Sequence, residues 1–405
     1  MNRKLSLITL GISLSSMLVL VGAMVVSQPK YTLKNIVGKQ SSLGDVIIYS
    51  QDQTGIYSSN SIMLSKDEYK FSKNIKQNPE TYKYVNGINE NRDMFKGYIY
   101  DTDFIYSDEN SIGYMDYVID NYGEFDITLS TTIHEKNLKT DEIEEFQINI
   151  SNNLKSENNI NHKELITKYN NEVYIALFGT QQNTPDRKKG EKDELEDFVE
   201  ISKVDFNNGE AKIVNKVNLK IDDDSKYRII YHNPFTIENK IYFFLEKQDK
   251  LENSYYLAYY DIHKNKFDYI DNKITLEYPL DTYQINIEGT KLNLLTSISN
   301  KNNVDLNLFT FDLESKEIII NNEEYSINKL NNQTDVYSFR VIDNKIYLLV
   351  DSCKTYNSDV RRDMREFAKN IVVLDKSSKT TLYIGEYRQG DEFTSNSYIL
   401  KSDEL

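Results

Sequence analysis

The stretch that decides the fold is Asn239–Ile270, which reads NKIYFFLEKQDKLENSYYLAYYDIHKNKFDYI. It contains two runs rich in Ile, Tyr, Phe and Leu, at 240–245 and 255–260, and a third short run after a polar turn that begins at Asp261. Short apolar and aromatic runs bounded by Asn, Asp and Lys are typical of β-strands. The stretch therefore predicts a strand, a loop, a second strand, a tight turn and a third strand.

Versions of this unit recur along the chain. Its first run is matched by NEVYIAL, TKLNLLT and NKIYLLV, which occupy 171–177, 290–296 and 344–350. The polar turn recurs as an apolar residue, then Asp or Ser, then several polar residues. These turns begin at Ser65, Asp120, Asp205, Asp261, Asp312 and Asp375. A carboxylate at the start of such a turn can accept hydrogen bonds from backbone N–H groups further on, so we interpret these Asp residues as structural.

The spacing of the turns indicates the architecture. Four of the five intervals lie between 51 and 63 residues, and the long interval from 120 to 205 contains polar inserts at 151–164 and 180–196. Units of about 40–50 residues with four strands, lengthened by loops, are typical of β-propeller blades. We predict an all-β fold, a β-propeller of six or seven four-stranded blades over residues 45–405. The C-terminal run 397–400 is predicted to complete the first blade and cover its open edge.

The recurring polar turn has Asp followed by polar residues and Gly or Lys. It resembles the turn between the third and fourth strands of the blades of quinoprotein and YncE-like propellers. The resemblance covers roughly residues 45 to 400 and implies a propeller fold. The chain has no Trp, so the Trp-Asp pairs of WD40 blades and the tryptophan-docking motif of quinoproteins are both missing. The double glycine of kelch blades is missing too. The resemblance therefore implies a fold and no activity.

Residues 1–28 have a different character. Arg3 and Lys4 precede Leu5–Val26, which is 22 residues without a charge. About 20 apolar residues span a bilayer as a helix, and positive charge before them predicts a cytoplasmic N-terminus. We predict a cytoplasmic stub and transmembrane anchor at 1–28, a polar linker at 29–44 and an extracytoplasmic domain beyond. A cleaved signal peptide is the alternative. The abundance of Asn, Lys and Ile is typical of an AT-rich bacterial genome.

The His and Cys residues form no recognisable motif. The single cysteine, Cys353, allows no internal disulfide and has no His near it in sequence. The four histidines share no spacing typical of a zinc site. We place His263 in a turn and His162 in an insert. We assign no function to any of the four, His134, His162, His232 and His263.

The acidic clusters are the next candidates for a site. Asp222–Asp224 could bind a hard cation such as calcium, but it lacks the alternating spacing of a calcium loop. We interpret it as solvated, together with Glu142, Glu144, Glu145 and the mixed-charge insert that begins at Arg187. We therefore assign no catalytic, cofactor-binding or metal-binding residue and no cofactor.

The composition excludes some classes of function. The formal net charge of −15 argues against binding to nucleic acid and against adhesion to anionic lipid or wall polymers. Motifs for a nucleophile or a phosphate loop are absent. We predict a membrane-anchored propeller that acts as a binding, scaffold or sensor module for a protein partner in the membrane or envelope. The alternatives are a hydrolase or lyase acting on a carbohydrate or peptide in the propeller channel, and an assembly partner of a transporter or two-component system.

Overall fold

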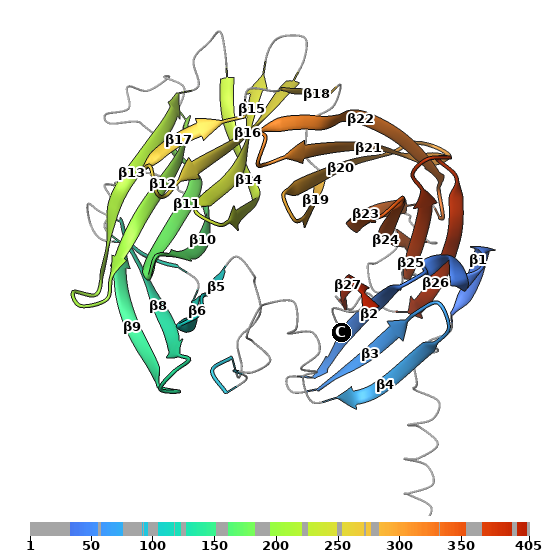
Figure 1. Ribbon diagram of the computed structural model, residues 1–405, viewed down its shortest axis with the longest axis horizontal. Helices are drawn as coiled ribbons and strands as arrows, with labels where there is room; N and C mark the ends of the chain where they lie inside the picture. Colours follow the sequence, from blue (N-terminus) through green and yellow to red (C-terminus); the bar gives the residue numbers. More distant parts are fainter. Residues whose placement is uncertain are drawn as a thin grey trace, which may run out of the picture. The chain divides into compact units, whose positions relative to one another are not determined.

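The computed structural model describes most of the chain beyond the N-terminus. The described residues are 33–55, 58–75, 91, 93–95, 104–116, 118–122, 127–150, 161–182, 195–220, 226–248, 253–270, 273–276, 283–331, 333–353, 367–390 and 395–402. They form strands almost throughout (Figure 1), as the sequence predicts. The chain divides into two compact units, one with residues 1–77, 295–308 and 323–403 and the other with the remainder.

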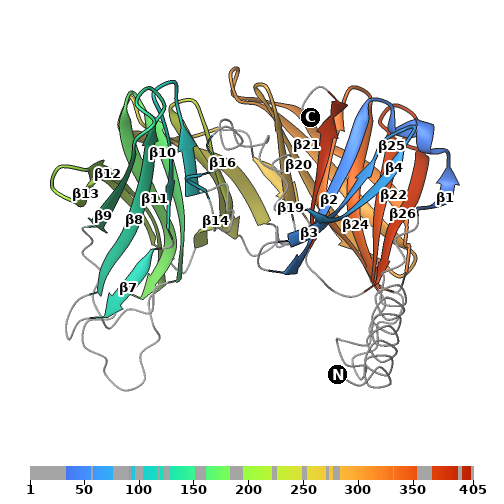
Figure 2. The ribbon, with the colours of Figure 1, turned by 90° about the horizontal axis from the view of Figure 1, so that it is seen from below.

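The first sheet is completed by the C-terminus. Its strand order is β27-β2-β3-β4, and its strands are β2 (Val46–Gly55), β3 (Ser58–Leu64), β4 (Tyr69–Ile75) and β27 (Ser395–Lys401). β27 pairs antiparallel with β2 from Val46↔Lys401 to Asp52↔Ser395, and the two strands lie side by side in Figure 2. This confirms the prediction that the run at 397–400 completes the first sheet.

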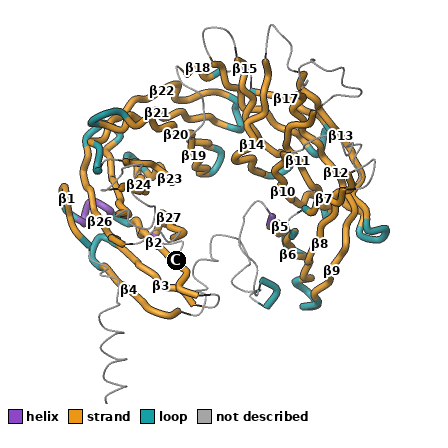
Figure 3. The backbone as a smooth tube through the Cα atoms, turned by 180° about the vertical axis from the view of Figure 1, so that it is seen from behind, coloured by secondary structure: helices purple, strands orange, loops and turns teal. Residues whose placement is uncertain are grey.

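A second sheet of the same unit has five strands. The order is β1-β26-β25-β24-β23, with β1 (Lys34–Gly38), β23 (Gln333–Ile342), β24 (Lys345–Cys353), β25 (Phe367–Asp375) and β26 (Thr381–Gly390). β1 lies along the outer edge of β26 (Figures 1 and 3) and is followed by a short 3-10 helix, η1 (Gln40–Leu43). The linker predicted at 29–44 is therefore wrong from residue 34 onward, because its second half belongs to the folded domain.

The other unit contains a nine-stranded sheet made of two meanders. One comprises β5 (Ile105–Ser107), β6 (Ser111–Met115), β7 (Ile119–Tyr122), β8 (Ile127–Asn137) and β9 (Ile143–Ile150). The other comprises β10 (Asn161–Tyr169), β11 (Glu172–Gln182), β12 (Leu195–Asp205) and β13 (Glu210–Lys220). A short parallel pairing joins β13 to β9, at Glu210↔Asn149 and Ala211↔Ile150.

Two further meanders complete the described strands. One sheet has β14 (Lys226–Ile237), β15 (Lys240–Gln248), β16 (Asn253–Asp261), β17 (Lys266–Tyr269) and β18 (Ile274–Leu276), with β17 and β18 both paired to β16. The other has β19 (Tyr283–Glu288), β20 (Lys291–Ser299), β21 (Asn303–Asp312) and β22 (Glu317–Asn328). The boundary between the two units runs through the strands of this last sheet.

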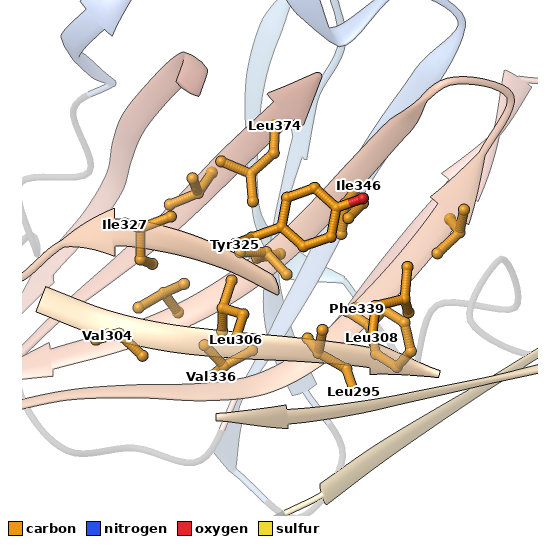
Figure 4. Close-up of a cluster of buried hydrophobic side chains, with 14 of the residues drawn as sticks. Leu295, Val304, Leu306, Leu308, Tyr325, Ile327, Val336, Phe339, Ile346 and Leu374 are labelled. Atoms are coloured by element: carbon orange, nitrogen blue, oxygen red, sulfur yellow. The ribbon is translucent and has the colours of Figure 1, made fainter. Parts of the chain in front are cut away.

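The run at 240–245 and its three matches were predicted as strands, and the four runs lie in β11, β15, β20 and β24. They are rich in apolar residues because both of their faces are largely buried. Side chains of β20 and β21 pack against those of β23 to β25 in one cluster, shown in Figure 4 with Leu306, Phe339 and Ile346 among its members. Equivalent clusters join β2 and β3 to β24 and β25, β8 to β11, β11 to β15, and β16 to β20. Successive meanders thus pack face to face within each unit.

The predicted turns form as their chemistry requires. Asp205, Asp261, Asp312 and Asp375 each accept a backbone N–H from two or three residues further on with a carboxylate oxygen, at 2.7–3.3 Å. The backbone N–H of Glu68 likewise donates to the Ser65 hydroxyl at 3.1 Å. The N–H that follows the Asp often donates across the sheet to the first hairpin turn, as from Ile262 to the Asn239 carbonyl at 2.9 Å. These side chains fix the ends of the sheets, so their structural interpretation is confirmed.

The prediction of a turn at Asp120 is wrong. Asp120 lies in β7, paired with Leu129 of β8. The corresponding turn begins at Asn137, whose side-chain oxygen accepts the backbone N–H groups of Lys139 and Thr140 at 2.9 and 3.2 Å. Glu145–Ile148 lies in β9, the last strand of this meander, so the next meander begins with β10.

The predicted inserts are shorter than 151–164 and 180–196, because 161–164, 180–182 and 195–196 belong to β10, β11 and β12. Within the described residues, no helix has the length and apolar character needed to cross a membrane. The anchor predicted at 1–28 lies outside the described residues.

Candidate functional site

Charged groups of the described residues converge on both faces of β8. His134 and Glu135 are adjacent on this strand, so their side chains point to opposite faces of the sheet. Each is the centre of a polar cluster that takes its other members from neighbouring strands. We call them the His134 cluster and the Lys168 cluster.

The His134 cluster places a carboxylate at each nitrogen of one imidazole. His134 Nε2 lies 3.2 Å from Asp116 Oδ2, and Nδ1 lies 3.4 Å from Glu145 Oε1. Tyr114 on β6 is the cross-strand partner of His134, and its ring stacks on the imidazole at 4.5 Å between centroids. The imidazole is largely buried whereas both carboxylates are exposed to solvent. The arrangement orients the ring and places a solvent-exposed carboxylate at each of its nitrogens.

The Lys168 cluster lies on the other face of β8. Lys168 of β10 has only 6% of its side chain exposed, and its Nζ lies 3.4 Å from both Asp108 Oδ2 and Glu135 Oε2. It also donates a hydrogen bond to the Ser111 hydroxyl. The ammonium lies between two carboxylates, and these contacts hold β10 against β6 and β8.

Tyr106 is the last member of the Lys168 cluster, and its ring lies against Gly113. Its hydroxyl donates to Glu135 Oε2 at 2.8 Å. A Cβ at Gly113 would lie 2.3 Å from Tyr106 Cζ, so the phenol needs the missing side chain there. Burial first, and then the charge of Glu135, raise the pKa of Tyr106 well above its ordinary value. The phenol therefore remains a neutral donor.

The pKa of Asp108 shifts in the opposite direction to that of Tyr106. Burial alone would raise the pKa of its carboxyl, but the N–H groups of Asn110 and Ser111 and the Lys168 ammonium hold that pKa below its ordinary value. Both N–H groups donate to Asp108 Oδ1 at 2.8 Å. The carboxylate is thus ionised and contributes to the lock between the strands.

A buried acid lies apart from these two clusters, on β12. Both carboxylate oxygens of Glu200 are inaccessible to solvent and accept no hydrogen bond from the described residues, although Lys216 Nζ lies 3.2 Å from Oε2. Burial raises the pKa of the Glu200 carboxyl, and the Lys216 charge opposes this only in part. The group is an electrostatic cost to the fold rather than a site open to a ligand.

The residues singled out in the sequence are mostly scattered. Cys353 ends β24 and is buried, and His263 is exposed in the predicted turn. His162 lies in β10 rather than in an insert, and His232 lies in β14. The run 222–224 and the charged insert at 187–194 lie outside the described residues. No group of three or more His, Cys, Asp or Glu side chains in the described part of the chain could hold a metal ion.

Sequence reasoning separated His134 from Glu145, although the two lie opposite each other on β8 and β9. It missed the Lys168 cluster entirely. One signal could have found that cluster: Gly113 interrupts an apolar strand, and an isolated glycine in a strand often marks the close approach of another group.

Comparison with known proteins identifies no family, because no family model and no curated protein matches the chain. Solved structures with similar folds include a β-1,2-mannobiose phosphorylase from Listeria innocua, at 10% identity and a TM-score of 0.32 over 55% of this chain and 75% of that one. A family GH43 β-1,3-galactosidase matches at 10% identity and 0.32, over 69% and 92%.

A β-propeller domain from Vanderwaltozyma polyspora matches at 10% identity and a TM-score of 0.24, over 90% and 98%. The neighbours thus include propeller and glycosidase-like folds. At such low identities and TM-scores, none of them indicates what this chain does.

Proposed function

We propose that this chain is a single-pass membrane protein whose extracytoplasmic domain is a closed, six-bladed β-propeller. In this proposal the domain acts as a binding, scaffold or sensor module for a protein partner in the membrane or envelope. The observation that carries the proposal is the pairing of β27 with β2, because it joins the last residues of the domain to its first sheet. A propeller needs such a closure to cover the open edge of its first blade.

The sheet arrangement supports the blade interpretation. The described strands group into six meanders of four principal strands, and clusters of buried side chains join successive meanders. The turns at the sheet ends are held by their own Asp, Asn or Ser side chains. A rigid frame with many loops at its ends suits the recognition of another protein.

The test is site-specific photocrosslinking in intact cells. Ser315 and Lys301 lie in exposed turns at opposite ends of β21, so a photoreactive amino acid at each position samples opposite ends of one sheet. We expect a discrete adduct with a membrane or envelope protein from one of the two ends. The absence of any adduct from both positions, in cells that display the protein at wild-type level, would refute the partner-binding function.

The alternative function is a hydrolase or lyase acting on a carbohydrate or peptide. The observation that favours it is the His134 cluster, because an imidazole with a carboxylate at each nitrogen can act as a general acid or base. Turnover of chromogenic glycosides or peptide anilides that falls at least about 100-fold in His134→Gln would support catalysis. The exposed His263→Gln is the matched control. Equal residual activity in the two variants would exclude this role for His134.

A further inference from the structure

β1 is a strand that is docked specifically but buries none of its own side chains. All five of its residues are exposed, including Ile36 at 45% and Val37 at 40%. Its backbone pairs with β26 from Lys34↔Glu386 to Gly38↔Tyr383, with a bulge that leaves Ile36 without a partner residue. Exposed large apolar side chains are few in the described residues, and here two are adjacent. Exposed apolar side chains that lie together mark a surface that contacts another molecule.

β1 is attached to β26 by contacts that depend on particular residues. The Tyr383 hydroxyl donates to Asn35 Oδ1 at 2.8 Å. Gly38 has a φ of +67°, and a Cβ there would lie 1.9 Å from the Leu382 carbonyl oxygen. Only glycine fits at this position. Ile36 and Val37 are therefore held at a defined place on the edge of the sheet.

The charge around β1 differs from that of the rest of the chain. Residues 27–44 contain three lysines, Lys30, Lys34 and Lys39, and no Asp or Glu, so this segment carries a charge of +3, whereas residues 45–405 carry −20. Lys34 and Lys39 flank Ile36 and Val37 and are exposed. An anionic surface would attract this segment and repel the others.

Chain length restricts where that surface can be. The uncharged run ends at Val26, eight residues before Lys34. Eight residues span at most about 28 Å when fully extended. If residues 5–26 cross the membrane, β1 is the first described strand outside it and lies within this distance of the lipid.

We propose that Lys34, Ile36, Val37 and Lys39, which we call the β1 surface, lie against the anionic phospholipid headgroups of the membrane. The two ammonium groups pair with headgroup phosphates, and the two apolar side chains enter the interfacial region. The contact fixes the orientation of the sheet β23–β26 toward the lipid. This inference rests on the membrane anchor of the proposed function.

The experiment uses the full chain in lipid nanodiscs with a fluorophore at Ile36→Cys. The native Cys353 is 2% exposed, so labelling is selective for the new cysteine. Ile319→Cys on β22 is the matched control, since Ile319 is also an exposed isoleucine on a sheet edge. Nanodiscs contain phosphatidylcholine alone or an equal mixture with phosphatidylglycerol, and a lipid bearing a quencher at the headgroup reports proximity.

We expect the label at position 36, and not that at 319, to be quenched, and more strongly in the anionic discs. Replacing Lys34 and Lys39 by Gln should weaken the contact about fivefold for each lysine. Equal quenching at positions 36 and 319 in a chain that enters the discs would overturn the inference and leave the anchor intact. Failure of the chain to enter the discs would overturn both. Quenching between labelled copies, independent of lipid charge, would assign the surface to a second chain instead.

Discussion

Replacing Ile399 by Ala tests the closure of the first sheet by β27. Ile399 is 6% exposed and packs in the cluster that joins β2 and β3 to β24 and β25. The change removes three carbons, worth about 2.4 kcal/mol at about 0.8 kcal/mol for each buried methylene. A cavity that collapses only in part adds to this, so we expect the free energy of unfolding to fall by about 3 kcal/mol.

The assay is denaturant unfolding of the purified full-length chain, followed by circular dichroism because the chain contains no Trp. Ile143→Ala is the control. Ile143 is 44% exposed on β9, so its loss should change stability by no more than about 0.5 kcal/mol. Hydrogen exchange should also accelerate in Val46–Gly55, the partner of β27, when Ile399 is replaced. If Ile399→Ala is as mild as Ile143→Ala, β27 does not support the sheet, and the argument for a closed propeller fails with it.

Three further predictions concern single side chains. Glu200→Gln should stabilise the protein increasingly as pH rises above about 4.3, because the unfolded carboxyl then loses a proton that the raised pKa in the folded state retains; urea unfolding across pH checks this. Gly113→Ala should destabilise by about 1–3 kcal/mol in thermal unfolding, and less so in a Tyr106→Ala background, because the new Cβ meets the Tyr106 ring. Asp375→Ala should weaken its turn, whereas Asp375→Asn should retain most of the stability at neutral pH; a loss as large for Asn as for Ala would show that the hydrogen bond from the Ser378 N–H is not what matters.

The strands that sequence reasoning located are those whose environment is uniform. β11, β15, β20 and β24 are covered on both faces, so a run of apolar residues suffices to mark them. The turns at Asp205, Asp261, Asp312 and Asp375 were found because their hydrogen bonds are local, within three residues of the Asp. In both cases the physical cause of the structure lies within the strand or turn itself.

The sequence predictions are wrong where a structure depends on distant residues, or where a residue other than Asp opens the turn. Asn137 opens its turn with an amide oxygen in place of a carboxylate, whereas the Ile119-Asp120 pair imitates the pattern inside a strand. β1 was interpreted as part of a polar linker because Gly38, Ser41, Ser42 and Gly44 lie in or near it. Its structure comes from the edge of β26, more than 340 residues further along the chain, and no local pattern records that pairing.

The candidate site was hidden for the same reason. Lys168, Asp108 and Glu135 come from β10, the turn before β6, and β8, so no spacing in the sequence brings them together. The two clusters take adjacent residues of β8, His134 and Glu135. A strand alternates its side chains, so Glu135 faces the lock with β10 while His134 faces the exposed carboxylates. Because of this alternation, a change at Lys168 acts on the packing of two meanders, whereas a change at His134 removes the imidazole that lies between the Asp116 and Glu145 carboxylates. A loss of function in His134→Gln without loss of stability would therefore report chemistry, and the same loss in a Lys168 variant would report folding.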